Sequence, residues 1–288
     1  MAAPCRLLRL RRWRSTRRAA STASSASSTS SRCKDKLGGP ENSISLRYGI
    51  LSDIHSNLEA LQAVIAEVDA MGVDELLCLG DIVGYGPSPN ECCDLLRERG
   101  VIAIAGNHDE AAVRAAEAER FNSLARAAIA WTRTQLTPEN RDFLAGLPRE
   151  RKVNGFAMVH GAPVHHFEYI MDVSDAQRAF ELTSEALTFV GHSHVAEVYY
   201  QEPAGRTFQQ RLLHGGRIDI VPEFRYIINV GSVGQPRDRN PQSSFAVYDG
   251  EASAVHVLRV AYDIDRVRER MARAELPEPL SERLAAGW

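Results

Sequence analysis

Apolar residues in the first part of the chain follow two alternating patterns. Short continuous runs are suited to buried strands, and between them apolar residues recur at the spacing of a helix. The order strand, helix, strand, helix, strand calls for parallel strands joined by right-handed crossovers. The strands are expected at 47–52, 75–79 and 101–105, and the helices at 58–71 and 89–100.

Polar residues and a proline mark where these two helices begin. Ser56 and Glu59 form a capping-box pair ahead of the first helix. Ser88, Pro89 and Glu91 match the N-cap, first and third positions of the second helix. Each helix therefore has its own start signal.

The second half of the chain changes from alternating elements to successive strands. Residues 110–146 have a helical pattern, with a new helix at Pro138, and two more buried strands follow with a helix between them. Short runs separated by Gly, Pro or Asp then predict mostly antiparallel strands, and the chain ends in one or two helices. The buried strands are expected at 156–160 and 186–190, the intervening helix at 174–183, the antiparallel set between 196 and 262, and the last helices at 263–288.

Composition is that of a globular protein with one large domain or two small ones. The 288 residues are 44% apolar and 25% charged, which excludes a disordered chain, a collagen and a coiled coil. No run approaches the roughly 18 apolar residues of a membrane span. The five cysteines are odd in number and form no C-x-x-C pair, so a reducing compartment is expected.

Charge divides the chain into a basic tail and an acidic body. Residues 1–34 carry nine Lys or Arg and no acid, so a net charge of −3 hides a balance of −12 on the remainder. Residues 1–45 are Arg-rich, then Ser-rich, and are expected to be disordered. Two interpretations stay open for them, a transit peptide and a spurious extension without function. The expected location is the cytoplasm, or the mitochondrion if the transit interpretation holds.

Candidate metal ligands follow five of the expected strands. In open α/β sheets, ligands bind beyond the carboxyl ends of the strands, so these side chains should converge. They are oxygen and nitrogen donors without thiolate, which suits Mn²⁺, Fe²⁺, Co²⁺ or Zn²⁺. Seven donors are too many for one catalytic metal but suffice for two that share a carboxylate. The seven are Asp53, His55, Asp81, Asn107, His160, His192 and His194.

The segments SDIHSN, GDIVGYGP, GNHD, HG and GHSH, taken together, resemble the calcineurin-like metallophosphoesterase superfamily. The chain is most similar to its compact bacterial and archaeal phosphodiesterase-like proteins, over about residues 47–262. The resemblance implies an α/β fold, a four-layer α/β/β/α sandwich of two mixed sheets with metals at the sheet edge. The expected organisation is a tail at 1–45, a metallophosphoesterase domain at 46–262, and helices at 263–288 that pack on it.

The resemblance also implies a role for each ligand. Asp53, His55 and His194 would bind the first metal, Asn107, His160 and His192 the second, and Asp81 would bridge both. The nucleophile would be a hydroxide bridging the metals, which agrees with the absence of a G-x-S-x-G motif or a P-loop. Manganese is the expected metal, with iron, cobalt, nickel and zinc as alternatives.

Five further residues are candidates for catalysis or substrate binding. His108 would sit near the leaving oxygen, as proton donor or charge stabiliser, and Asp109 would either orient its ring or cap the following helix. Asn57, Tyr85 and Arg237 are candidates for substrate binding. Their alternatives are helix capping for Asn57, loop packing for Tyr85 and a surface ion pair for Arg237.

These expectations together predict a two-metal phosphoesterase that hydrolyses a phosphate monoester or diester. A nucleotide or dinucleoside polyphosphate is the expected substrate type, by analogy with the subgroup. The acidic body argues against a long nucleic-acid partner, and no membrane partner is expected. A protein Ser/Thr phosphatase and a non-catalytic scaffold of the same fold remain as alternatives. The oligomeric state is not predicted.

Overall fold

The computed structural model describes residues 46–163 and 165–288. The predicted basic tail, residues 1–45, lies outside the described residues. Within the described ranges, no helix is long and apolar enough to cross a membrane.

The first half of the described chain has the predicted strand–helix alternation. All the helices expected there form, and β1, β2 and β3 pair in parallel. The elements are β1 (Arg47–Leu51), α1 (Leu58–Met71), β2 (Glu75–Cys78), α2 (Pro89–Glu98), β3 (Ile102–Ala103), α3 (Asn107–Val113), the 3₁₀ helix η1 (Ala115–Arg120), α4 (Ser123–Gln135) and α5 (Pro138–Ala145).

The second half supplies most of the antiparallel pairing, as the sequence predicts. Only β6 with β5 and β6 with β10 pair in parallel among these described strands. The elements are β4 (Glu150–Val153), β5 (Phe156–Val159), α6 (Val173–Leu182), β6 (Leu187–Val190), β7 (Ala196–Gln201), β8 (Thr207–Arg211), β9 (Gly216–Asp219), β10 (Arg225–Val230), β11 (Ser243–Asp249), β12 (Ala254–Val260), α7 (Ile264–Arg273) and α8 (Glu278–Ala286).

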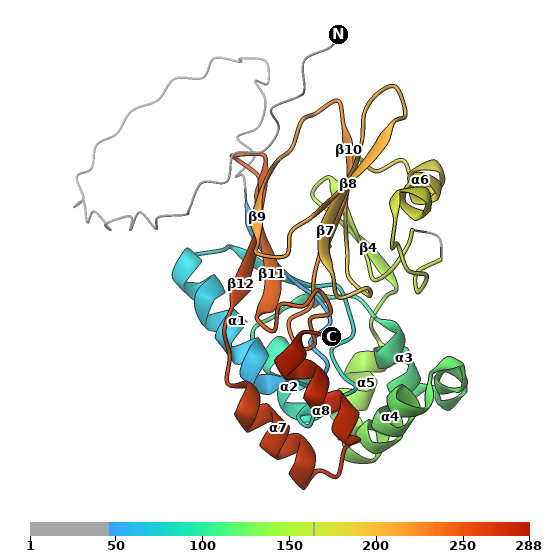
Figure 1. Cartoon of the computed structure of the whole chain (residues 1–288), viewed down its shortest axis with the longest axis vertical. Coiled ribbons are helices and arrows are strands. Elements are labelled where there is room, and N and C mark those ends of the chain that lie inside the picture. The colour runs from blue at the N-terminus through green and yellow to red at the C-terminus, as the bar shows by residue number, and fades with distance from the viewer. Residues whose placement is uncertain (1–45, 164) are drawn as a thin grey trace, which may run out of the picture.

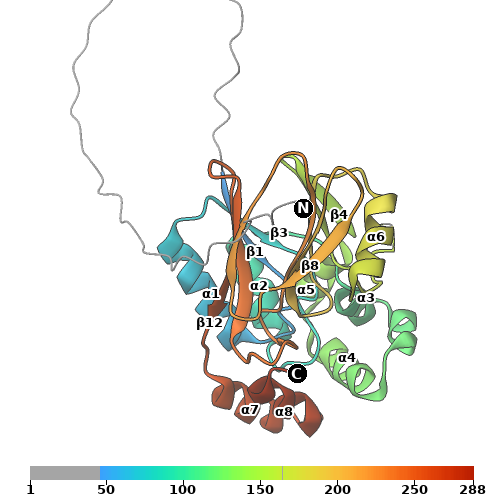
Figure 2. The ribbon, with the colours of Figure 1, turned by 45° about the horizontal axis from the view of Figure 1, so that its top comes forward.

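The strands form two mixed six-stranded sheets that face each other between layers of helices, the four-layer α/β/β/α arrangement (Figure 1). The first sheet has the order β3-β2-β1-β11-β12-β9 and the second β4-β5-β6-β10-β7-β8. The helices α1 and α2 lie on the outer side of the first sheet, and α6 on the outer side of the second (Figures 1 and 2).

Burial on both faces explains why the central strands read as continuous apolar runs. In β2 and the residue after it, Leu76 and Cys78 join the cluster under α1 and α2, whereas Leu77 and Leu79 join the cluster between the sheets. A strand covered on both sides needs apolar residues at every position rather than at alternate ones. The cluster between the sheets fixes how the two sheets, and the loops that leave them, face each other.

The C-terminal helices α7 and α8 pack on the loop end of the domain. Their apolar residues, among them Val267, Met271 and Leu280, form a cluster with Tyr85 and with residues of α4. Arg270 of α7 also pairs with Glu59 of α1 at 3.0 Å.

Three predictions about local structure are wrong. Ser56 does not cap α1, because its amide donates to the Ile82 carbonyl and the N-cap is Asn57. The strands β4 and β9 are missed, and β3 is shorter than expected. All three strands lie at sheet edges. At an edge, a strand has exposed polar residues or ends its hydrogen-bond pairing early, and both weaken the apolar pattern in the sequence.

Candidate metal centre

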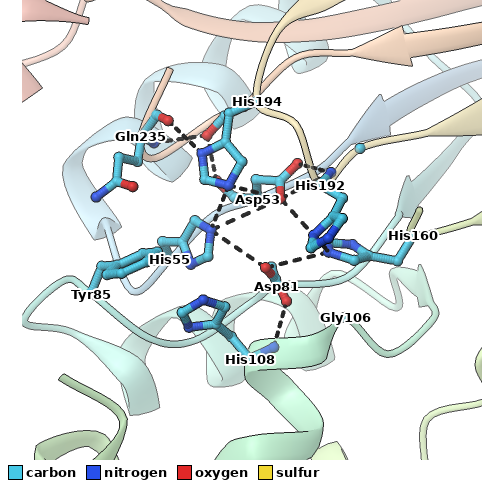
Figure 3. Close-up of polar contacts among 12 residues, drawn as sticks. Asp53, His55, Asp81, Tyr85, Gly106, His108, His160, His192, His194 and Gln235 are labelled. Atoms are coloured by element: carbon cyan, nitrogen blue, oxygen red, sulfur yellow. Dashed lines mark hydrogen bonds and ion pairs between the residues drawn. The ribbon is translucent and has the colours of Figure 1, made fainter. Parts of the chain in front are cut away.

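Six of the seven candidate ligands, all except Asn107, converge where the loops of the two sheets meet (Figure 3). The first sheet delivers Asp53 and His55 after β1, and Asp81 after β2. The second sheet provides His160 after β5, and His192 and His194 after β6. Every one of these positions follows the carboxyl end of a parallel strand, and Asn107 begins α3 just beyond β3. The strand ends therefore bring together residues that lie up to 141 positions apart in the chain.

The side chains form two groups that share Asp81. In the first, the ligand atoms of Asp53, His55, Asp81 and His194 lie within 4.8 Å of one another, and in the second those of Asp81, His160 and His192 do. Oδ2 of Asp81 is 3.5 Å from Nε2 of His55 and 3.4 Å from Nε2 of His160. Asp81 thus lies between the groups, where one carboxylate can contact two cations.

Backbone carbonyls orient three of the histidines. A histidine that donates its Nδ1 proton to a carbonyl presents the lone pair of Nε2 on the other side of the ring, the arrangement common at metal sites. All three Nε2 atoms then point toward the carboxylates. The Nδ1–carbonyl pairs are His55 with Val83 at 3.2 Å, His160 with Leu79 at 2.8 Å and His194 with Gln235 at 2.6 Å.

The ring nitrogens converge as a cation would require. Nε2 of His55 is 3.1 Å from Nε2 of His194, and Nε2 of His160 is 3.1 Å from Nδ1 of His192. In the His55–His194 pair both Nδ1 atoms face carbonyls, so the two Nε2 lone pairs face each other and repel unless a cation lies beside both. Oδ1 of Asn107 is buried with no hydrogen-bond partner among the described residues, which costs free energy unless it binds an ion. The residues present therefore fit divalent metal ions.

Burial shifts the pKa of three of the candidate ligands. It raises the pKa of Asp53 to about 7, and the neighbouring Asp81 raises it further against the opposing effect of His160. Burial also holds the pKa of His55 and of His194 well below the usual value. Their rings are therefore neutral at pH 7, which is the form that binds a metal.

Five of the seven ligands hold a left-handed backbone conformation. Residues other than glycine rarely adopt it, and each instance costs of the order of 1 kcal/mol or more. Such conformations persist where the surrounding structure enforces them, and here hydrogen bonds tie the loops together, as between the amide of His55 and the Asp81 carbonyl at 2.9 Å. The φ values are 52° for Asp53, 49° for His55, 52° for Asp81, 67° for His192 and 60° for His194.

Two glycines allow the backbone to approach the carboxylates. A Cβ atom on Gly106 would lie 2.1 Å from Oδ1 of Asp81, and one on Gly191 would lie 2.6 Å from Oδ2 of Asp53. Both distances are far below van der Waals contact. The glycines of GNHD and GHSH therefore have a steric role at the site as well as a role in turning the chain.

His108 lies beside the site but has no orienting carboxylate. Its ring packs against His55, Tyr85 and Phe121 at centroid distances of 4.8, 4.4 and 4.6 Å. The Nδ1 atom is buried, with no hydrogen-bond partner in the described part of the chain. Burial lowers the pKa of His108 to about 4, so its ring is neutral near pH 7.

The prediction that Asp109 orients His108 is wrong. Its Oδ1 accepts from the amides of Ile82 and Val83 at 2.9 and 3.1 Å, and its Oδ2 accepts from the amide of Gly106 at 3.0 Å. The carboxylate is used by three backbone amides and does not reach the ring. Asp109 occupies the third position of α3 rather than the N-cap, and from there it fixes the loop that carries Asp81.

The three candidates for substrate binding differ in whether their polar groups already bond to other residues. Asn57 caps α1 by accepting from Ala60 at 3.1 Å, and it donates to the Gly234 carbonyl at 2.9 Å. It is 1% exposed, and capping of α1 is the alternative that the sequence left open for it. The alternative left open for Arg237, an ion pair at the surface, does not form with the adjacent Asp238, whose carboxylate pairs with Arg259.

Arg237 and Tyr85 lie together at the site. One guanidinium nitrogen of Arg237 is 3.4 Å from the Tyr85 hydroxyl and 2.9 Å from Oε1 of Gln235. Its Nε is buried, and no described residue accepts from it. A guanidinium with a donor to spare beside a metal site is suited to a phosphate oxygen.

Sequence reasoning missed two residues at the site. Gln235 holds His194 through its carbonyl and Arg237 through its side chain. Tyr169 stacks on His192 with centroids 3.9 Å apart. A contact made through a main-chain carbonyl has no residue-type signal in the sequence. Tyr169 had no such signal either.

Comparison with known proteins gives concordant results. The family model described as the calcineurin-like phosphoesterase superfamily domain matches residues 46–253. An uncharacterised protein of Methanocaldococcus jannaschii is 38% identical over 246 residues, which cover 83% of this chain and 97% of that protein.

Solved structures share the fold. The crystal structure of a metallophosphoesterase from Sphaerobacter thermophilus is 40% identical, with a TM-score of 0.75, over 85% of this chain and all of that one. A hypothetical protein from Pyrococcus horikoshii has a TM-score of 0.69 at 20% identity, over 84% of this chain and 98% of that one, and shows likeness of fold alone.

Proposed function

We propose that two divalent ions bound at the described cluster drive hydrolysis of a small phosphate ester. The premise is that the chain belongs to the calcineurin-like phosphoesterase superfamily and is a phosphoester hydrolase. The carboxylate of Asp81, shared by the two groups of ligands, is the observation that supports the proposal most directly. Asp53, His55 and His194 would hold one ion, and Asn107, His160 and His192 the other. Bound there, the ions supply an activated water and stabilise charge on the phosphoryl group.

The protein's own residues position the substrate and complete the charge balance. Arg237, whose amide donates to the carbonyl of His194 at 3.1 Å, would bind a phosphate oxygen through its guanidinium. Tyr85 supports it through the 3.4 Å contact with its hydroxyl. The neutral ring of His108, next to His55, would stabilise negative charge on the leaving oxygen by donating a hydrogen bond.

A small substrate and manganese are the finer parts of the proposal. Outside residues 1–34 the charge balance is −12, which disfavours a long polyanion and suits a mono- or diester bound through the metals. The nitrogen and carboxylate donors suit manganese, and iron, cobalt, nickel and zinc are compatible with the same set. A scaffold without catalysis is disfavoured because all seven donor residues are present and six of them form the two groups described.

The experiment is hydrolysis of bis-p-nitrophenyl phosphate by the full chain. Activity should appear with added Mn²⁺, disappear after treatment with a chelator and return when the metal is restored. If each divalent metal from Mn²⁺ to Zn²⁺ leaves the wild type inactive on both this diester and p-nitrophenyl phosphate, the proposal fails.

A further inference from the structure

A cavity opens directly from the proposed second metal position. It has a volume of about 250 Å³. Two candidate ligands, Asn107 and His192, form one wall, and the other walls are Glu117, Arg120, Phe121, Phe167 and Tyr169. A phosphoryl group held by the ligands would therefore have one of its substituents facing this cavity.

Three aromatic rings of the cavity are fixed against histidines of the site. Tyr169 stacks on His192 at 3.9 Å and 14°. Phe121 lies 4.6 Å from the ring of His108, and Phe167 lies 6.2 Å from that of His160. Since each ring is held by a different histidine, the aromatic walls keep a fixed position relative to the metal ligands.

The ring of Tyr169 has a face available for a ligand. His192 covers one face, yet the residue is 49% exposed, which is unusual for an aromatic side chain at a buried site. The stack with His192 holds the ring in place from that side. A rigid aromatic ring with one open face is a stacking platform for another flat ring.

The remaining walls provide polar groups for the edge of such a ring. Arg120 and Glu117 form an ion pair at 3.9 Å, with the arginine side chain 82% exposed. A guanidinium offers donors and a carboxylate offers acceptors, and both groups complement the amino and carbonyl edges of nucleobases. The cavity is smaller than the 300–1,000 Å³ of typical drug-sized sites, so it suits one base rather than a longer chain.

We propose that this cavity, with Tyr169 as its platform, binds the base of a nucleoside phosphoester whose phosphate lies at the metal centre. The inference rests on the proposed function, because the metal ligands must hold the phosphate. If the cavity binds a base, Tyr169 is a specificity-determining residue. The protein should then select phosphate esters of nucleosides over phosphate esters of sugars or simple alcohols.

The test compares the binding of nucleotides and of a matched ligand without a base. The full chain loaded with Mn²⁺ is titrated by calorimetry with the four common nucleoside 5′-monophosphates and with ribose 5-phosphate. The nucleotides should bind about tenfold or more tightly, the size of effect expected for one stacked base. Tyr169→Leu should remove this advantage and leave the affinity for ribose 5-phosphate unchanged, and Tyr169→Phe should keep most of it.

Met171→Ala is the matched control, because Met171 is 52% exposed on the same segment but does not line the cavity. It should bind all five ligands like the wild type. Nucleotides that bind no better than ribose 5-phosphate, or an advantage that survives in Tyr169→Leu, would overturn the inference. Failure of the proposed function has a different signature: ribose 5-phosphate would then bind equally well to Asp81→Asn and to the wild type.

Discussion

The backbone amide of His108 donates a 2.8 Å hydrogen bond to Oδ1 of Asp81. Since this bond engages one carboxylate oxygen, Oδ2 is left to face His55 and His160 at 3.5 and 3.4 Å. The first turn of α3 therefore determines which oxygen of Asp81 is turned toward the two groups of ligands.

Asp81→Asn should abolish metal binding at both positions while the fold persists. The amide oxygen can still accept from His108, but the charged oxygen between the imidazoles is lost. Metal content measured by mass spectrometry should fall well below that of the wild type, and activity should fall at least 100-fold. Asp69→Asn, an exposed carboxylate on α1, is the control and should retain metal. A variant with unchanged metal content would show that Asp81 is not shared.

Gly106→Ala should weaken metal binding without removing any ligand. The new methyl group would meet Oδ1 of Asp81 at 2.1 Å, so the carboxylate or the turn must move. Displacing the support of a ligand typically costs 10- to 100-fold in metal affinity. Gly146→Ala is the matched control, because its Cβ would find its nearest neighbour at 3.4 Å. Equal metal affinities in the two variants would contradict the steric role of Gly106.

Arg237→Lys should raise KM for phosphodiester hydrolysis about tenfold and change kcat less, because lysine keeps the charge but not the planar set of donors. Arg239→Lys provides the comparison. Arg239 lies two residues after Arg237 in the chain, and its guanidinium stacks over the ring of Trp288. An unchanged KM in Arg237→Lys would remove Arg237 from the proposed substrate contacts.

Arg259→Met should destabilise the protein by about 3–5 kcal/mol, because it leaves the carboxylate of Asp238 buried without its partner. The two side chains are 4% and 0% exposed. The double variant Asp238→Asn/Arg259→Met should recover part of the loss in urea unfolding. Arg273→Met, which breaks an exposed pair with Glu269, should cost less than about 1 kcal/mol. Equal losses for the buried and exposed pairs would contradict the expectation.

The positions of the ligands could be predicted because strand ends and chemistry coincide in the sequence. Asp53, Asp81 and His160 each follow an apolar run, and the parallel order of the strands brings those ends together. The edge strands β4 and β9 could not be predicted in the same way. Their residues are mostly exposed or half-buried, so burial does not impose an apolar pattern.

The supporting contacts were predicted less well than the ligands. The role of Asp109 depended on whether its carboxylate would meet a ring or backbone amides. Its carboxylate accepts from three amides, two in the loop after β2 and one after β3. The carbonyls of Leu79, Val83 and Gln235 orient histidines, but every residue has a carbonyl. Which one is used depends on the course of the backbone, and side-chain identity does not specify it.

The left-handed backbone at five ligands has a consequence for how sequences of this kind change over time. Glycine or asparagine would relieve the strain at Asp53 or His192, so selection for stability alone would favour their loss. A lineage that stopped using the metals would be expected to replace these residues early and gain stability by doing so. Aspartate and histidine at these strained positions are therefore the residues expected of a chain that still uses the metals.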